Sequence, residues 1–165
     1  MLVLGIDPGT ATTGYGLVKY EAGRQLMIDY GVISTKANME MAFRLCKINQ
    51  DLDNLITKYS PDVVAVEHLY HQNNAKTVIT VAQGRGVVLM TAANRGLEVA
   101  EYTPLQVKQS VVGYGKADKN QVQFMVQKIL TLPALPKPDD AADALAVAIC
   151  HVHSHKLRNI QKGGN

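Results

Sequence analysis

The chain has 165 residues, of which 47% are hydrophobic and 19% are charged. This length and composition suit one globular domain with a buried core, and they exclude a modular multidomain machine and an intrinsically disordered protein. Lys and Arg number 17 against 14 Asp and Glu, so the net charge of +3 is only mildly basic. No stretch reaches the roughly 18 apolar residues of a membrane span, and the first residues lack a secretory signal pattern. We therefore predict a cytosolic protein with no membrane partner.

The first third of the chain is predicted to form three antiparallel strands. Apolar runs at 2–7, 15–20 and 26–34 have the length and composition of strands. A short segment with Gly separates the last two runs, which is typical of a hairpin turn. We expect these strands to lie side by side in chain order.

The remaining two thirds are predicted to alternate helices and strands. From 38 to 59 apolar residues recur every three or four positions, which predicts an amphipathic helix that ends before Pro61. The same reasoning predicts strands at 62–67 and 97–102 and helices that begin near 74, 103, 118 and 138. The expected fold class is α/β, with a five-stranded mixed sheet and helices on both faces. One domain is expected over 1–155, with a mobile tail at 156–165.

Four carboxylates occupy positions where a hydrophobic core does not favour them. Asp7 ends the first strand and Glu67 ends the fourth. Asp140 and Asp143 lie three residues apart on one face of the last helix. If the first and fourth strands are neighbours, Asp7 and Glu67 emerge at the same edge of the sheet, where the last helix can bring the other pair to them.

Converging carboxylates repel one another and become protonated unless cations hold them together. Oxygen ligands favour Mg²⁺ or Mn²⁺. A pair of such ions about 4 Å apart is suited to phosphodiester cleavage. The four carboxylates therefore predict a catalytic metal site.

Each carboxylate also has a purely structural interpretation. Asp7 suits the turn that follows it, Glu67 suits a strand end exposed to solvent, and Asp140 suits a helix N-terminus. Asp143 is harder to explain in this way, because it interrupts an Ala-rich stretch in which Ala or Leu would pack better. The coincidence of all four residues favours the metal site.

Residues 103–137 form the most basic segment of the chain, with five lysines against Asp118. A local excess of positive charge is typical of a surface that binds phosphates. Lysines on the outer faces of helices are also common on ordinary solvated surfaces. From charge alone, both interpretations stay open.

A series of short motifs stands in order along the chain: Gly5-Ile6-Asp7-Pro8-Gly9, Val64-Ala65-Val66-Glu67, Gln83-Gly84-Arg85-Gly86, Gln106-Val107-Lys108-Gln109 with Val111-Val112-Gly113, and Asp140-Ala141-Ala142-Asp143-Ala144-Leu145. Together they closely resemble the RuvC family of Holliday-junction resolvases. The likeness extends in order over 2–153. The spacing makes it specific, whereas the Asp-Pro-Gly-Thr turn alone would be a weak signal.

The resemblance implies an RNase H-like fold and a homodimeric, Mg²⁺-dependent endodeoxyribonuclease. Such a dimer nicks two strands of like polarity in a four-way DNA junction symmetrically, in homologous recombination and DNA repair. The resemblance also implies two Mg²⁺ ions in each site, for which Mn²⁺ substitutes. A branch-migration complex of RuvA and RuvB is the partner that it implies.

The resemblance assigns roles to particular residues of this chain. The catalytic, metal-binding carboxylates of the family correspond to the four identified above. Its functional basic residues correspond to Lys108 and Lys119, and Lys116 lies in the same positive segment. Where the family has a Phe that stacks on bases near the junction, this chain has Tyr70, for which we expect the same DNA-binding role.

The helix predicted to begin at 74 corresponds to the dimer contact of the family. We expect Gly84 and Gly86 to permit close approach of the two subunits.

The histidines of the chain have two interpretations each. His68 stands where relatives often have Gln, and we expect a solvated loop histidine there rather than a ligand of the metal site or a phosphate. His151, His153 and His155 alternate near the end of the last helix. We expect them to lie on a mobile helix end rather than to bind a transition metal.

Three other functions are compatible with parts of the pattern. A nuclease of the same fold acting on flaps or forks would have the same carboxylates. A junction-binding scaffold would be expected to lack one of them. Actin-like ATPases and sugar kinases share the Asp-Pro-Gly-Thr loop but need two such domains, which exceeds the length of this chain.

Overall fold

The order of the strands brings distant parts of the chain together. The computed structural model describes residues 1–68 and 75–163, without the side chains of 75, 76 and 159–163. The sheet has five strands in the order β3-β2-β1-β4-β5. Their bounds are β1 Leu2–Asp7, β2 Thr12–Glu21, β3 Arg24–Ser34, β4 Val63–Glu67 and β5 Glu98–Tyr102. The predicted fold class and the neighbouring positions of the first and fourth strands are confirmed.

The sheet is mixed, as expected. β1 pairs antiparallel with β2 and parallel with β4, and β4 pairs parallel with β5. Because β1 and β4 run in the same direction, their carboxyl ends meet at one edge of the sheet. Asp7 and Glu67 are the last residues of these two strands, so the sheet topology alone places both at that edge.

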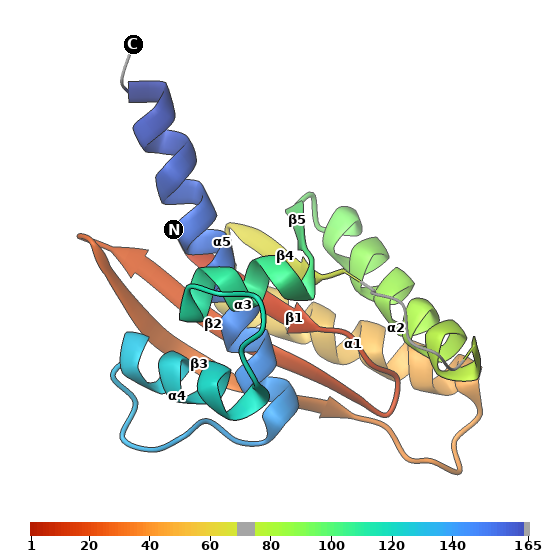
Figure 1. Ribbon diagram of the computed structural model, residues 1–165. Coiled ribbons are helices and arrows are strands. Elements are labelled where there is room, and N and C mark those ends of the chain that lie inside the picture. Colours follow the sequence, from red (N-terminus) through yellow and green to blue (C-terminus); the bar gives the residue numbers. More distant parts are fainter. Residues whose placement is uncertain (69–74, 164–165) are drawn as a thin grey trace.

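Helices cover both faces of the sheet (Figure 1). Their bounds are α1 Met41–Tyr59, α2 Ala75–Asn94, α3 Pro104–Val112, α4 Lys119–Ile129 and α5 Asp139–Gly163. The starts of α3 and α4 are fixed by capping boxes, in which Thr103 and Asp118 accept hydrogen bonds from the backbone of the residue three positions on. These caps confirm the two helix starts that the sequence predicted.

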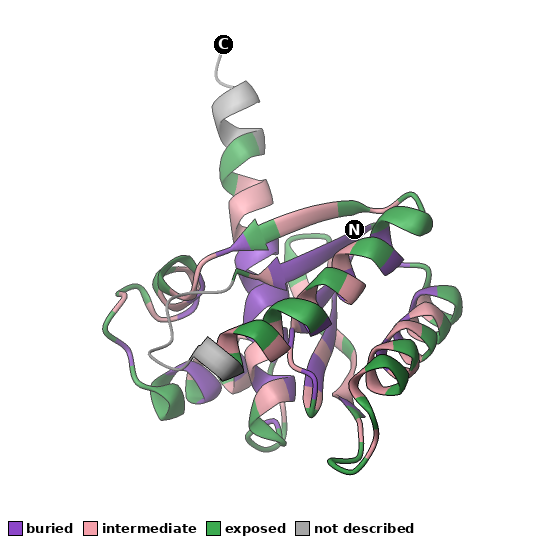
Figure 2. Cartoon of the chain, turned by 90° about the vertical axis from the view of Figure 1, so that its right-hand side faces the viewer, coloured by how far each residue is buried: buried purple, intermediate pink, exposed green. Residues whose placement is uncertain are grey.

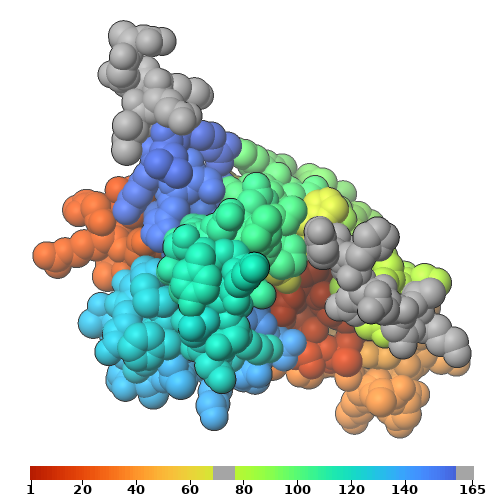
Figure 3. Space-filling model, viewed as in Figure 1, coloured from red at the N-terminus to blue at the C-terminus, as the bar shows by residue number. Residues whose placement is uncertain are grey.

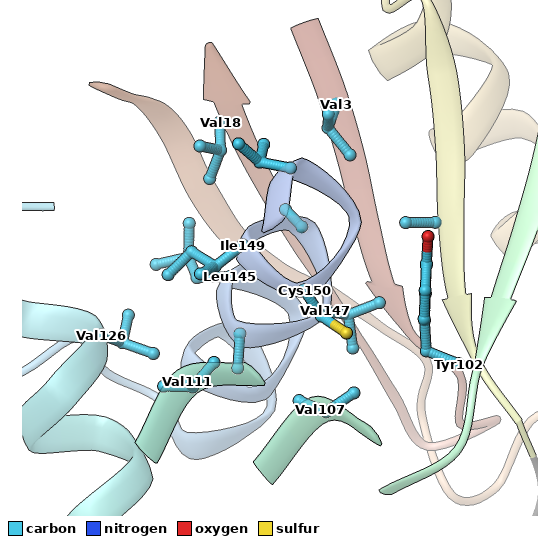
Figure 4. Packing of buried hydrophobic residues seen from close by; sticks show 14 of the residues in the cluster. Val3, Val18, Tyr102, Val107, Val111, Val126, Leu145, Val147, Ile149 and Cys150 are labelled. Atoms are coloured by element: carbon cyan, nitrogen blue, oxygen red, sulfur yellow. The ribbon is translucent and has the colours of Figure 1, made fainter. Parts of the chain in front are cut away.

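Two hydrophobic cores lie on opposite faces of the sheet, and Figure 2 shows buried residues concentrated in the central strands and the first half of α5. The core on one face packs α1 and α2 against residues such as Leu4 and Ile6. The core on the other face packs α5 between the sheet and the pair α3 and α4. In Figure 4 Leu145 and Ile149 of this helix lie among Val18, Val111 and Val126.

Helix α5 approaches the backbone of β1 and β2 unusually closely. A Cβ added to Gly14 would lie 1.9 Å from the carbonyl oxygen of Asp140, and one added to Gly5 would lie 2.1 Å from that of Ala144. Such separations are far shorter than a van der Waals contact. Glycine is therefore required at these positions for the start of α5 to reach the sheet.

Helix α5 continues to Gly163, past the domain boundary expected at 155. The single domain and the mobility of 156–165 stay predictions. Within the described part of the chain, no helix is long and apolar enough to span a membrane.

A Gly14→Ala substitution tests the close approach of α5. The added methyl group forces the first turn of α5 away from β2, so we expect the free energy of unfolding to fall by about 1–3 kcal/mol or more. Urea denaturation of the wild-type and variant proteins measures this difference. Equal stability of the two proteins would show that the contact is not a constraint on the fold.

Candidate active site

The four predicted carboxylates are gathered at the edge of the sheet where β1 and β4 end. Asp7 is paired in register with Gly14, and Gly14 is the residue against which the backbone of Asp140 packs. The first turn of α5 is thereby brought beside the end of β1. Asp143 follows one turn later on the same helix. All four carboxylate residues are partly buried.

The pKa values show that these carboxylates act on one another. Burial first, and then repulsion by Glu67, Asp143 and Asp140, raise the pKa of Asp7 to about 8. Burial and repulsion by Asp143 raise the pKa of Glu67 to about 7, against the opposing attraction of Lys108 and Lys119. Perturbation of this kind is typical of functional sites, because the fold keeps together charges that separate in water.

A cleft of about 220 Å³ opens beside this cluster. It is lined by Glu67, Pro104, Val107, Lys108, Lys119, Val122, Asp143 and Ala146. Figure 3 shows red atoms of the N-terminal segment recessed beside the green and teal atoms of the α3 region. The cleft thus combines carboxylates from the sheet and α5 with two lysines from α3 and α4.

Lys119 is bound to the carboxylate cluster. Its Nζ lies 3.2 Å from Oδ2 of Asp143 and 3.4 Å from Oδ2 of Asp139. Burial raises the pKa of Asp143, and the attraction of Lys119 opposes this effect. A cation is therefore already part of the balance of charge in this site.

The donor set fits a hard divalent cation. It consists of carboxylate oxygens, which Mg²⁺ and Mn²⁺ prefer, and two of these groups have pKa values near neutrality that a cation would lower. Among the described residues, however, no three Asp, Glu, His or Cys side chains are already arranged to hold a metal ion. Asp143 is directed to Lys119 instead.

Of the other residues predicted to bind DNA, one lines the cleft and one lies outside it. Lys108 lines the cleft with Lys119, whereas Lys116 is exposed on the segment between α3 and α4 and is not part of the cleft lining. Tyr70 lies outside the described residues.

The side chain of His68 is 54% exposed, in line with the solvated histidine expected there, and it lies near Glu101. Its Nε2 lies 4.0 Å from Oε2 of Glu101, which also forms an ion pair with Arg85 of α2. Its backbone N–H donates a hydrogen bond of 2.7 Å to the carbonyl oxygen of Tyr102. His68 therefore directly follows Glu67 at the end of β4, and its backbone extends the pairing with the end of β5.

The histidines of α5 are packed, which differs from the mobile helix end that we expected. His151 is 3% exposed, and its Nδ1 lies 2.9 Å from the hydroxyl of Tyr102. Burial lowers the pKa of His151 to about 4. Nδ1 of His153 lies 3.1 Å from Oγ of Ser110 on α3. These contacts arise because α5 stays docked on the sheet and on α3 along this part of its length.

Gly84 does not have the role that we expected. A Cβ added there would lie 3.1 Å from the carbonyl oxygen of Gly9 and 3.2 Å from Cγ2 of Thr10, so Gly84 lets α2 approach the loop after Asp7 in its own chain. Gly86 has no atom within 4 Å of an added Cβ and is exposed. Of these two glycines, Gly86 is the one that is exposed and could contact a partner.

The sequence interpretation missed two residues beside the site. Gln123 lies in α4 with 6% of its surface exposed, and its Nε2 donates a hydrogen bond of 2.9 Å to Oδ1 of Asp139. Asp139, at the start of α5, was likewise not among the predicted site residues. A polar residue inside the apolar stripe of a helix was the signal that could have identified Gln123.

Comparison with known proteins settles the family. Residues 3–151 match the family model described as "Crossover junction endodeoxyribonuclease RuvC". The chain belongs to the RuvC family. A relative of that name from Syntrophomonas wolfei is 67% identical over 95% of this chain and 91% of its own length. One from Ruminiclostridium cellulolyticum is 55% identical over 95% of both chains.

Solved structures give the same result. The structure described as "T. thermophilus RuvC in complex with Holliday junction substrate" has a TM-score of 0.90 and 33% identity, covering 95% of this chain and 96% of the other. The yeast mitochondrial Holliday junction resolvase Ydc2 has a TM-score of 0.66 at 16% identity, covering 98% and 85%. This second likeness supports the fold alone, which is the RNase H-like fold that the sequence predicted.

The raised pKa of Asp7 predicts how stability depends on pH without divalent ions. The pKa of Asp7 is 3.8 in the unfolded chain and about 8 in the folded protein. At pH values between these two, the unfolded chain binds fewer protons than the folded one. Stability therefore falls as pH rises through this window. Asp7→Asn removes the free-energy cost of ionising this buried carboxyl. We therefore expect the melting temperature of the variant at pH 8 to exceed that of the wild type by roughly 2–4 °C or more.

Thermal unfolding in a chelator at several pH values measures this effect. The matched control is Asp53→Asn on α1. Because Arg95 lowers the pKa of Asp53, removing the Asp53 carboxylate is not expected to stabilise the protein at high pH. If Asp7→Asn raised the melting temperature equally at pH 4 and pH 8, the stabilisation would not come from the ionisation of Asp7.

Proposed function

We propose that this protein resolves four-way DNA junctions by cutting two strands of like polarity symmetrically. The observation that carries this function is the group of four carboxylates at the edge of β1 and β4, in a chain that belongs to the RuvC family. The bacterial relatives are named crossover junction endodeoxyribonucleases, and one structural relative is described with a Holliday junction substrate. The setting would be homologous recombination and DNA repair in the cytoplasm.

Asp7, Glu67, Asp140 and Asp143 would hold two Mg²⁺ ions in this site, for which Mn²⁺ would substitute. The bound ions would supply an activated water and stabilise the leaving oxygen of the phosphodiester. The protein contributes rigid placement, since Asp7 and Glu67 end central strands and the other two lie on a helix fixed in the core. The raised pKa values of Asp7 and Glu67 support this role.

Lysines would bind the phosphates of the junction. Lys108 and Lys119 line the cleft and would offset the charge of the scissile phosphate. Lys116, exposed on the adjoining segment, would contact the neighbouring backbone. Tyr70 would stack on a base near the cut. Because phosphate contacts release counterions, junction affinity would fall steeply as salt rises.

The active form would be a homodimer. One site cuts one strand, whereas resolution requires two related cuts, so a two-fold assembly suits a two-fold junction. The outer face of α2 supports this form, because Ile79 and Met90 are 59% and 49% exposed and Gly86 between them has open space above it. A branch-migration complex of RuvA and RuvB would deliver the junction.

Asp7→Asn separates the chemical role of the site from DNA binding. The substitution removes a carboxylate and keeps the side-chain volume, so we expect Mg²⁺-dependent cleavage of a synthetic four-way junction to fall at least about 100-fold. Binding to the junction, measured by mobility shift without divalent ions, is expected to change less than about threefold. Asp53→Asn serves as the control and keeps both properties.

Substrate choice is tested with the same proteins. Paired, ligatable nicks in the junction, with a linear duplex and a flap left uncut, support resolution. Preferential cleavage of the flap would show that the chemistry is right and the substrate class is wrong. Equal loss of binding and cleavage in Asp7→Asn would instead make Asp7 a structural residue.

Met90→Asp tests the dimer. A charge in the centre of an apolar interface loses its hydration, so we expect the variant to sediment as a monomer at concentrations where the wild type is a dimer. Leu26→Asp is the matched control, because Leu26 is also about half exposed but lies on β3 at the other edge of the sheet. A dimer that Met90→Asp leaves intact would exclude the outer face of α2 as the interface.

A further inference from the structure

Asp143 has two competing cationic partners. It contacts the Lys119 ammonium at 3.2 Å, and it is also one of the ligands that we propose for the metal ion. A carboxylate oxygen cannot serve both cations equally well, because an ammonium beside a divalent ion is repelled by it. Metal binding at Asp143 therefore requires Lys119 to give up part of this contact.

Asp139 offers Lys119 a second carboxylate at the same place. Its Oδ2 lies 3.4 Å from Nζ of Lys119, while its Oδ1 accepts the 2.9 Å hydrogen bond from Gln123. Gln123 is buried in α4, so it fixes the Asp139 side chain in orientation. The side chains of Asp139 and Lys119 are 56% and 52% exposed, which leaves the ammonium room to shift from one carboxylate to the other.

We propose that Asp139 is a positioning residue that retains Lys119 beside the cleft when Asp143 binds a metal ion. Lys119 keeps its pair with Asp139 and remains available to the phosphate, and Asp143 is free to turn inward. This inference rests on the proposed function, because it takes Asp143 as a metal ligand. Neither the Lys119–Asp139 pair nor the Gln123 contact follows from the carboxylate motif itself.

The consequence is a coupling between Asp139, Lys119 and metal affinity. Without Asp139, metal binding would deprive Lys119 of both carboxylates that it contacts in the described structure. The ammonium would then compete more strongly for Asp143. Because exposed ion pairs are weak, the coupling is expected to be about threefold in the metal dissociation constant.

A double-mutant cycle measures this coupling without DNA or turnover. Mg²⁺ binding to the wild type, Asp139→Asn, Lys119→Met and the double variant is followed by calorimetry or by the rise in melting temperature with Mg²⁺ concentration. Lys119→Met is expected to bind Mg²⁺ more tightly, because the competing ammonium is gone. Asp139→Asn is expected to weaken binding about fivefold when Lys119 is present and less than about twofold when it is absent.

Comparing the effect of Asp139→Asn in the wild type with its effect in Lys119→Met distinguishes two explanations. In one, Asp139 positions Lys119; in the other, its negative charge simply attracts the metal ion. Loss of a nearby negative charge weakens Mg²⁺ binding with or without Lys119, so an equal effect in both backgrounds overturns the proposal. No effect of Asp139→Asn in either background also overturns it. The variant Gln123→Met keeps every charge and is expected to weaken binding only in the presence of Lys119.

Failure of this inference differs from failure of the proposed function. If the wild type binds Mg²⁺ and Asp7→Asn abolishes that binding, the metal site stands whatever Asp139 does. If the wild type binds no divalent ion at all, the proposed function fails and this inference fails with it.

Discussion

The contact between α5 and the strand pair β1–β2 is the constraint on which the site depends. Gly14 and Gly5 let the helix backbone reach the sheet, and this approach sets how far Asp140 and Asp143 lie from the end of β1. The hydrophobic residues of α5 then hold the helix between the sheet and α3 and α4. The same packing that stabilises the fold therefore also determines the geometry of the carboxylates.

That geometry has a cost in stability. Carboxylates that the fold holds together repel one another, and their burial adds a desolvation penalty, as the raised pKa values of Asp7 and Glu67 show. Two extensive cores, one on each face of the sheet, offset this penalty. Lys119 offsets part of it locally through its contact with Asp143. The mutual repulsion and burial of these carboxylates favour the binding of cations, which a nuclease of this family needs.

Local sequence patterns were sufficient for most of the fold. The apolar periodicity predicted the strands and the helix starts to within a few residues, because each element buries one regular face, whereas the end of α5 at Gly163 was not predicted. The starts of α3 and α4 were evident because Thr103 precedes a Pro at the first turn of a helix and Asp118 precedes Gln121 by three positions. The grouping of the four carboxylates was predicted on the condition that the first and fourth strands are neighbours, and the order of the sheet meets this condition.

Contacts between residues far apart in the sequence could not be predicted from such local patterns. Gly84 was assigned to a subunit contact, but it packs against Gly9 and Thr10, and only the folded path of the loop after Asp7 places these atoms there. The pair of Asp139 and Gln123 joins two helices across a connector rich in Pro. His151 was misjudged because helical periodicity does not tell how far α5 stays docked.

Helix α5 carries two of the carboxylates at its start and much of one core along its next turns. These carboxylates are therefore not on an appendage that can loosen while the rest of the domain survives. A partially unfolded form that keeps the sheet but releases α5 would lose the core on that face as well. On heating, cutting activity and cooperative structure should consequently disappear together, so that inactivation reports directly on global unfolding.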